Sequence, residues 1–423
     1  MISRVINLIT SSLAQRFKKN GSKWGGGIGL LWRGNNSTLY NNALIGTVFN
    51  RQASIVISKS NFLFESSRVA IYQYAKSIGL CAKDRVQILG FTCDAVTDAI
   101  KPFGSKISLY DCDNSLRSQN FTLSDDTRLL ICQVTFGVSA LSEDVLALAA
   151  SRGVKVLIDK SLSYGTQDFS ASNAPKYPEV LSFEVSKSFT IGWGGMLRMP
   201  EKLTAEFSHY YSTLGVVSLW DDASRVIRVT LNLFMVRHGG IFAYGLWVIL
   251  RALGMHRLSA KSSLSKYHNQ SVMGPFSRRI FTDLISEIPE LLRVSNKNHF
   301  LLKNSLEKAG FRVISSSHEG SSTPRVAFLV DKIRKLEVQR WFAEHDIELG
   351  YWFDSFPLRE NEFDQKNFPG CVQLMSSVVN LPCHGSLNAL EITRMCTCIE
   401  EFKFSESEKI EDGSVCERLF GQR

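Results

Sequence analysis

The first 64 residues contain no acidic side chain, although the whole chain has 40 Asp and Glu residues against 49 Lys and Arg residues. Eight basic residues precede the first acid, Glu65, so residues 1–64 carry a formal charge of +8 and residues 65–423 carry only +1. A body this close to neutral argues against a nucleic-acid-binding protein, because phosphate affinity needs a clustered basic face. The positive charge belongs instead to an N-terminal arm.

The sequence also lacks the cysteine spacing of a zinc site and the apolar length of a membrane-spanning helix. Its nine cysteines are widely spaced and include no Cys-x-x-Cys pair, so we expect no metal site and a reduced, cytoplasmic compartment. The longest apolar run, residues 239–250, has twelve residues, whereas a helix that crosses a bilayer needs about 20. We therefore expect a protein that is soluble or peripheral at a membrane surface.

Residues 1–20 have the pattern of a basic amphipathic helix. Apolar side chains recur at helical spacing from Ile2 to Phe17, and Asn20-Gly21 is a typical helix stop. Three interpretations stay open: a peripheral membrane contact, an organellar targeting peptide, or an arm that packs on the body or on a partner subunit.

From residue 54 onward, predicted strands alternate with predicted helices. The strands are predicted at 85–89, 106–110, 128–132, 154–158, 180–183 and 196–198, and the helices at 66–78, 95–103 and 142–151. This alternation indicates βαβ units and a mainly parallel sheet covered by helices, in which ligands bind at the carboxyl ends of the strands. A smaller α/β unit is indicated at 311–395, with a strand at 325–330 and a helix at 335–345.

Three features fall where such a sheet binds its ligands. Asp159 ends an apolar strand, and Lys187 follows another strand and precedes a Gly-rich turn, as a Schiff-base nucleophile could. Ser66-Ser67-Arg68 opens a helix, whose N-terminal N–H groups favour a phosphate. Each feature alone has an ordinary structural explanation, namely a turn-forming Asp, a solvated Lys and a Ser helix cap.

Their order and spacing resemble the fold-type I pyridoxal-phosphate enzymes and, among these, the DegT/DnrJ/StrS group of sugar aminotransferases. Residues 66–113 are similar to the group's stretch of phosphate-binding turn, helix, strand, helix and strand, and residues 128–165 to its central strand, Phe-Gly turn, helix and aspartate strand. The most specific similarity is LSFEVSKSFTIGWGGML at 181–197, which resembles the group's SF-x-x-x-K…GGM segment. VVNLPCHGSLNALEITRM at 378–395 resembles the group's segment before its last helix.

This resemblance implies a fold-type I aminotransferase-like α/β fold, with a large domain built on a mainly parallel, helix-covered sheet and a smaller α/β C-terminal domain. The expected divisions are a basic arm and connector at 1–53, the large cofactor-binding domain at 54–265, the small domain at 266–404 and a loose tail at 405–423.

The resemblance also implies pyridoxal 5'-phosphate as the cofactor and gives the matching residues their roles. Lys187 is then the catalytic lysine, which binds the cofactor as a Schiff base and later moves protons, and Asp159 pairs with the protonated pyridine nitrogen. The backbone N–H groups of Ser67 and Arg68 and the hydroxyl of Ser182 hold the phosphate. The side chain of Arg68 either adds charge there or faces solvent.

Two expected cofactor contacts depart from the group's pattern. The glutamine that usually follows the aspartate is Leu162 here, and the aromatic residue that often stacks on the ring falls at Cys93, so Phe91 or Phe136 are alternatives for stacking. Residues 210–264 form a longer aromatic and basic stretch than the group has. It serves either as a surface that faces the substrate or a membrane, or as a core helix pair and dimer contact.

The expected function is transfer of an amino group from an amino acid, by resemblance glutamate, to a keto-sugar that is nucleotide-linked, in surface glycan or natural-product biosynthesis. The alternatives are a pyridoxal-phosphate enzyme with a non-sugar acceptor and a non-catalytic scaffold at a membrane. We expect a homodimer with a small-molecule amino donor and keto acceptor, and no nucleic-acid partner.

Overall fold

The computed structural model describes residues 58–402, except for 119, 166–167, 169–173, 185–186, 228–269, 316–320, 346, 348, 351 and 360–361. The predicted arm at 1–53, most of the stretch at 210–264 and the predicted tail at 405–423 therefore lie outside the described residues. Among the helices in the described ranges, none is both long enough and apolar enough to cross a bilayer.

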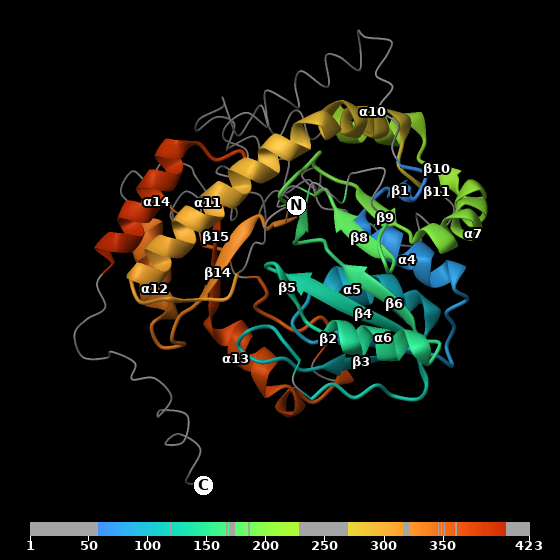
Figure 1. The fold of residues 1–423 in the computed structure, drawn as a ribbon, viewed down its shortest axis with the longest axis horizontal. Coiled ribbons are helices and arrows are strands. Elements are labelled where there is room, and N and C mark those ends of the chain that lie inside the picture. Colours follow the sequence, from blue (N-terminus) through green and yellow to red (C-terminus); the bar gives the residue numbers. More distant parts are fainter. Residues whose placement is uncertain are drawn as a thin grey trace, which may run out of the picture.

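One large mixed sheet forms the centre of the bigger unit (Figure 1), with the strand order β10-β11-β1-β9-β8-β6-β4-β2-β3, and β5 pairs with β4 beside it. The strands are β1 (Asn61–Phe64), β2 (Arg85–Leu89), β3 (Lys106–Tyr110), β4 (Thr127–Thr135), β5 (Val138–Ser139), β6 (Lys155–Asp159), β8 (Glu179–Ser182), β9 (Gly195–Arg198), β10 (Gly215–Val216) and β11 (Gln270–Val272). Strands β3, β2, β4, β6 and β8 run parallel, whereas β9 is antiparallel to β8. The carboxyl ends of β2, β6 and β8 therefore meet at one edge of the sheet.

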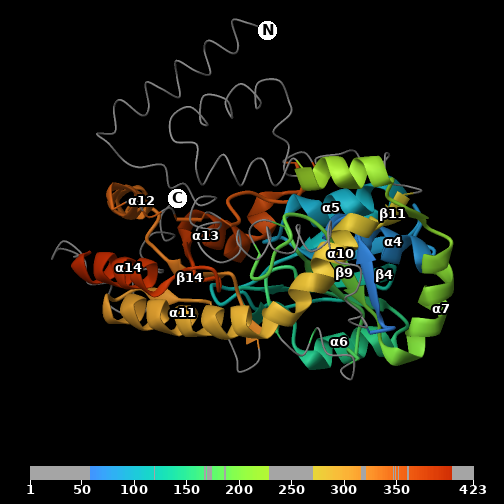
Figure 2. The same ribbon diagram turned by 90° about the horizontal axis from the view of Figure 1, so that it is seen from above.

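Helices cover both faces of this sheet. On β4, Leu129 and Ile131 belong to the core shared with α4 (Ser67–Ser77) and α5 (Asp94–Ile100), whereas Leu130 and Cys132 belong to the core shared with α6 (Glu143–Ser151). Figure 2 shows α6 on the opposite side of the strands from α4 and α5. Burial on both faces explains why the central strands are almost wholly apolar.

The predicted element boundaries agree with the structure to within a few residues. The helix predicted at 142–151 begins at Glu143, because Ser142 is its N-cap and its Oγ accepts a hydrogen bond from the Val145 N–H at 3.4 Å. The helix predicted at 95–103 is α5 followed by a 3-10 turn, Lys101–Phe103, and it ends at Gly104 with a φ of 67°. That left-handed conformation is one that glycine adopts without strain.

The smaller unit is built on the antiparallel sheet of β12 (Arg312–Val313), β14 (Arg325–Leu329) and β15 (Val378–Pro382). It packs on α11 (Ile288–Lys308), α12 (Lys335–Glu344) and α14 (Ala389–Glu401), and α14 begins with the Asn388–Glu391 capping box that the sequence indicates. Figure 1 shows the long helix α11 running from the larger unit into this one.

The remaining elements are short helices, turns and a two-stranded sheet. They are α7 (Glu201–Ser212), α10 (Pro275–Leu284), α13 (Pro369–Ser377), the 3-10 turns Ile285–Glu287 and Gln365–Asn367, and the small sheet of β7 (Tyr164–Gly165) and β13 (Ser321–Ser322). Helix α10 packs on the large sheet, since Ile280 and Phe281 share a core with Leu181. Strand β11, beyond the expected division at 265, is part of the large sheet.

Candidate active site

Lys187 lies in the loop that joins the antiparallel strands β8 and β9. Tyr164 fixes this loop, because its hydroxyl donates a hydrogen bond to the Phe189 carbonyl at 2.8 Å and accepts one from the Phe189 N–H at 2.6 Å. Thr190 adds a hydrogen bond from its Oγ1 to the Phe183 carbonyl at 2.9 Å. The half-buried Lys187 therefore projects from a loop that is tied to the body on its C-terminal side.

Asp159 ends β6 and lies within electrostatic range of Lys187. Its carboxylate is buried, and Oδ1 accepts a hydrogen bond from the Ser161 N–H at 3.0 Å. Burial raises the pKa of this carboxyl, while the Ser161 hydrogen bonds and the Lys187 charge act in the opposite direction. Lys187 is thus near enough to Asp159 for its charge to act on the carboxyl, and these are the two residues that the resemblance gives as the catalytic lysine and its acidic companion.

Cys93, at the position expected for the ring-stacking residue, also lies near Lys187. Burial raises the pKa of its thiol to about 11, against an opposing effect of the Lys187 charge. The Cys93 Sγ donates to Asp94 Oδ1 at 3.3 Å. A thiol provides no ring, so Cys93 cannot supply the stacking that an aromatic side chain at this position would give.

The two phenylalanines considered as replacements are engaged elsewhere. The Phe91 ring packs edge-on against Phe353, with the ring centres 5.3 Å apart. Phe136 is fully buried in the core on the α6 side of the sheet.

The N-terminus of α4 and strand β9 form a tight cradle. Ser66 is the N-cap of α4, and the first turn, which begins at Ser67, presents N–H groups that the helix itself does not use. A Cβ at Gly195 would lie 2.3 Å from the Ser67 nitrogen, so only glycine lets β9 approach the helix this closely. Gly195 is also the register partner of Ser182 in β8. Ser67 and Ser182 therefore flank the same glycine.

The hydroxyl of Ser182 suits a ligand at this cradle. Ser182 is 1% exposed, and its Oγ has no hydrogen-bond partner among the residues that the structure describes. Leaving a buried hydroxyl without a partner costs about 1–3 kcal/mol. An anionic oxygen would satisfy this hydroxyl and the N–H groups of α4 together, so the predicted phosphate contacts of Ser67 and Ser182 fit such a group.

Two other residues, Arg68 and Leu162, are predicted to contact the cofactor, and their side chains offer it no unbalanced charge. The Arg68 side chain turns toward α5, where its Nη2 lies 3.7 Å from Asp98 Oδ2, so a carboxylate already balances its charge. Leu162 is 6% exposed and offers only an apolar surface.

The smaller unit contributes an indole ring and a buried cation that the sequence reasoning missed. The Lys187 Nζ lies 5.3 Å from the centre of the Trp352 ring, and the Arg325 guanidinium carbon lies 4.6 Å from the same centre. Arg325 Nη1 donates to Asn380 Oδ1 at 3.0 Å. A Cβ at Gly350 would lie 2.3 Å from that Nη1, so glycine makes room for the pair. The available signal was an arginine at the start of an otherwise apolar strand, RVAFLV.

Two more polar groups are buried in this region without partners in the described part of the chain, Asn380 Nδ2 and His384 Nε2. Burial, together with the charge of Arg325, lowers the pKa of His384 to about 3, so its imidazole is neutral at ordinary pH. Asn380 and His384 therefore add unused hydrogen-bonding capacity beside the Arg325–Asn380 pair.

No family model matches the chain, and no curated protein matches its sequence. Solved structures nevertheless share its fold. The aminotransferase TlmJ from Streptoalloteichus hindustanus aligns with a TM-score of 0.59 and 14% identity over 87% of this chain and 91% of that one. A DegT DnrJ EryC1 StrS aminotransferase from Brucella abortus aligns with a TM-score of 0.57 and 12% identity over 94% and 95%. NtdA from Bacillus subtilis, solved with bound cofactor PMP, aligns with a TM-score of 0.56 and 13% identity over 94% and 81%.

These alignments cover 87% to 94% of this chain and 81% to 95% of the chains compared. They confirm the predicted fold class. The chain has the fold of the DegT/DnrJ/EryC1/StrS-type aminotransferases.

Proposed function

We propose that this protein is a pyridoxal-phosphate-dependent aminotransferase that moves an amino group from an amino acid, glutamate by resemblance, to a keto-sugar that is nucleotide-linked. Surface glycan or natural-product biosynthesis is the proposed setting. The observation that carries the proposal is that Lys187, in the loop after β8, lies within electrostatic range of Asp159, at the end of β6, in the fold described above. The cradle at Ser67, Gly195 and Ser182 supports it, because it fits the phosphate of that cofactor.

The residues of this chain then have distinct tasks. Pyridoxal phosphate, when bound, supplies an electron sink for the carbon that loses or gains a proton. The Lys187 amine carries that proton, and its loop is positioned for this by Tyr164. The buried Asp159 carboxylate holds a proton on the ring nitrogen. Ser182 and the first turn of α4 bind the phosphate and so fix the ring relative to Lys187.

Arg325 is proposed to bind a carboxylate of the amino donor. It is 5% exposed, and its guanidinium lies over the same indole ring as the Lys187 amine. A planar guanidinium recognises carboxylates through paired hydrogen bonds. The unused nitrogens of Asn380 and His384 add hydrogen-bonding capacity beside it.

A homodimer is proposed as the working assembly. The helical residues 219–227 expose Leu219, Trp220 and Ile227 by 63%, 80% and 57%. Apolar side chains grouped in this way favour burial against another chain. We expect light scattering to give the mass of a dimer, and Trp220→Ser to weaken the dimer at low protein concentration. A monomeric wild-type protein at all concentrations would contradict this.

The enzyme proposal is tested by mixing purified protein with pyridoxal phosphate and following its absorbance. The wild-type protein should turn yellow, and borohydride should fix the cofactor on a peptide that contains Lys187. Lys187→Ala should still bind the cofactor weakly but lose amino transfer by at least about 1,000-fold. Lys155→Ala, which changes an exposed lysine at the start of β6, should leave both colour and transfer intact. A wild-type protein that stays colourless would favour the non-catalytic scaffold instead.

A further inference from the structure

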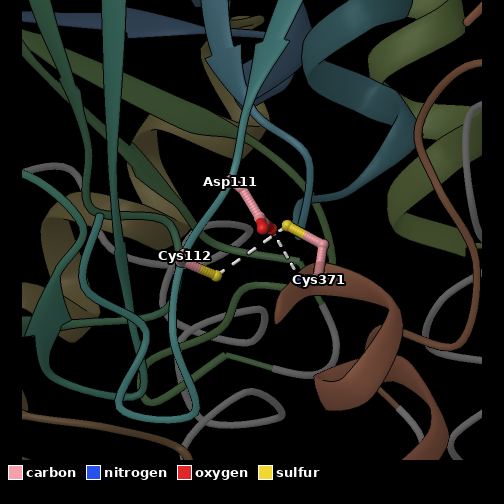
Figure 3. A group of neighbouring side chains, drawn as sticks. All are labelled: Asp111, Cys112 and Cys371. Carbon is pink, nitrogen blue, oxygen red and sulfur yellow. Dashed lines mark hydrogen bonds between the residues drawn. The ribbon is translucent and has the colours of Figure 1, made fainter. Parts of the chain in front are cut away.

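A group of metal-ligating side chains lies outside the candidate active site. Asp111 and Cys112 follow β3, and Cys371 lies in the first turn of α13, 259 residues beyond Cys112. The two sulfurs are 3.8 Å apart, and they and a carboxylate oxygen all lie within 4.8 Å of one another. Figure 3 shows the three side chains converging from the end of β3 and the start of α13.

We propose that Asp111, Cys112 and Cys371 bind one zinc ion. Two sulfurs held at about 2.3 Å from a tetrahedral zinc ion lie about 3.8 Å from each other, which is the separation found between Cys112 and Cys371. A disulfide requires the sulfurs to approach to about 2.05 Å. In the metal-free chain the two thiols form a hydrogen bond at this distance, and the same spacing suits two ligands of one ion. A water molecule would complete the tetrahedron.

The charges of the group are compatible with such an ion. With Asp111 ionised and both thiols protonated, its formal charge is −1. When zinc replaces the two thiol protons, three anionic ligands and one dication again sum to −1. The ion therefore adds no net charge to a buried region in which Cys112 and Cys371 are 4% and 0% exposed.

The ligands are held in place by the surrounding backbone. The Asp111 carboxylate accepts hydrogen bonds from the N–H groups of Gly370 at 3.0 Å and Cys371 at 2.8 Å. Carboxylates that bind metals are commonly oriented by such bonds, and each oxygen retains a further lone pair. A Cβ at Gly370 would overlap the Cys112 carbonyl oxygen, so glycine allows the start of α13 to reach the end of β3.

The ion would have a structural role next to the active site. The Cys371 Sγ lies 3.1 Å from where a Cβ on Gly90 would be, and Gly90 directly follows β2 on the way to Cys93. Zinc would thus tie α13, and the segment from Trp352 that precedes it, to the strands that carry the site. It would take no part in amino transfer.

The test measures metal in the full chain, purified without a metal column and incubated with zinc sulfate before gel filtration. Elemental analysis should find about one zinc per wild-type chain and less than about a tenth of that in Cys371→Ser. Cys132→Ser is the matched control, because Cys132 is a buried thiol of the same core and lies outside the group. It should keep the wild-type zinc content.

A second measurement on the wild-type protein does not depend on whether the variants fold. Cobalt added to metal-free protein should give the near-ultraviolet absorption of thiolate-to-cobalt charge transfer, and zinc should abolish it. Absence of both zinc and this absorption would overturn the proposal. So would equal loss of zinc from Cys132→Ser, or a metal-free wild-type protein whose mass shows a Cys112–Cys371 disulfide.

Discussion

The Nζ of Lys187 lies 5.3 Å from the centre of the Trp352 ring, although the two residues belong to different units of the fold. A cation over an indole face gains about 0.5–2 kcal/mol, depending on how far the pair is desolvated. The same ring also contacts Arg325, so one side chain places the proposed proton carrier and the proposed carboxylate-binding group around a common centre. The candidate site is therefore complete only when the smaller unit is packed on the larger one.

Replacing Arg325 with lysine should separate donor binding from chemistry. Lysine keeps the charge but loses the planar stacking on Trp352 and the paired hydrogen bonds to a carboxylate. We expect KM for the amino donor to rise at least about tenfold, with a smaller change in kcat. Initial rates at varied donor concentration measure this. Arg312→Lys, on the exposed neighbouring strand β12, is the control and should change neither constant. An unchanged donor KM in Arg325→Lys would remove Arg325 from the donor site.

Ser182→Ala should weaken cofactor binding without destabilising the protein that lacks cofactor. The variant removes a buried hydroxyl that has no partner among the described residues, so the melting temperature of the cofactor-free protein should stay equal or rise. The dissociation constant for pyridoxal phosphate, from an absorbance titration, should rise about tenfold through loss of one hydrogen bond to a charged group. Ser108→Ala removes another unpartnered buried hydroxyl, on β3, and should leave cofactor affinity unchanged. Equal affinities in wild type and Ser182→Ala would exclude the phosphate role.

Asp159→Asn should lower amino transfer and stabilise the cofactor-free protein, and the stabilisation should depend on pH. Because the folded-state pKa of Asp159 is raised, its contribution to stability is present at low pH and is lost as the pH rises through that pKa. The amide cannot ionise and can still accept the Ser161 hydrogen bond. The cofactor-free variant should therefore gain stability over wild type as the pH rises from about 4 to about 8. Thermal melts at several pH values measure this gain.

In the same variant, amino transfer should fall by at least about 100-fold, because a neutral amide cannot stabilise a protonated ring nitrogen. Full activity in Asp159→Asn would contradict the proposed role. A melting-temperature difference that stays constant with pH would contradict the raised pKa.

The sequence was informative where neighbouring residues determine the structure. The period of the apolar residues placed the strands and helices of the large sheet, and the positions of Asp159 and Lys187 at strand ends followed from that order. The contacts of the smaller unit could not be predicted in this way. Trp352 reaches Lys187 from 165 positions along the chain, and nothing in its local sequence indicates that approach.

The cysteines show a related limit of spacing in the sequence. Their spacing led to the expectation of no metal site, since ligands of small zinc motifs lie close in sequence. Cys112 and Cys371 are 259 positions apart and meet only because α13 packs against the end of β3. The spacing of cysteines in the sequence identifies ligand pairs that are close along the chain. It gives no information about pairs that packing brings together.

The close approach of Gly195 to Ser67 also sets an order of events in synthesis. The cradle needs β9 as well as the N-terminus of α4. Strand β9 lies more than a hundred residues after the start of α4, against which it packs. A ribosome-bound chain that has exposed only α4 and the first parallel strands therefore has half of the cradle. Capture of the proposed cofactor must wait until β9 has emerged and paired between β8 and β1, so loading with pyridoxal phosphate should report the insertion of β9 into the large sheet during translation.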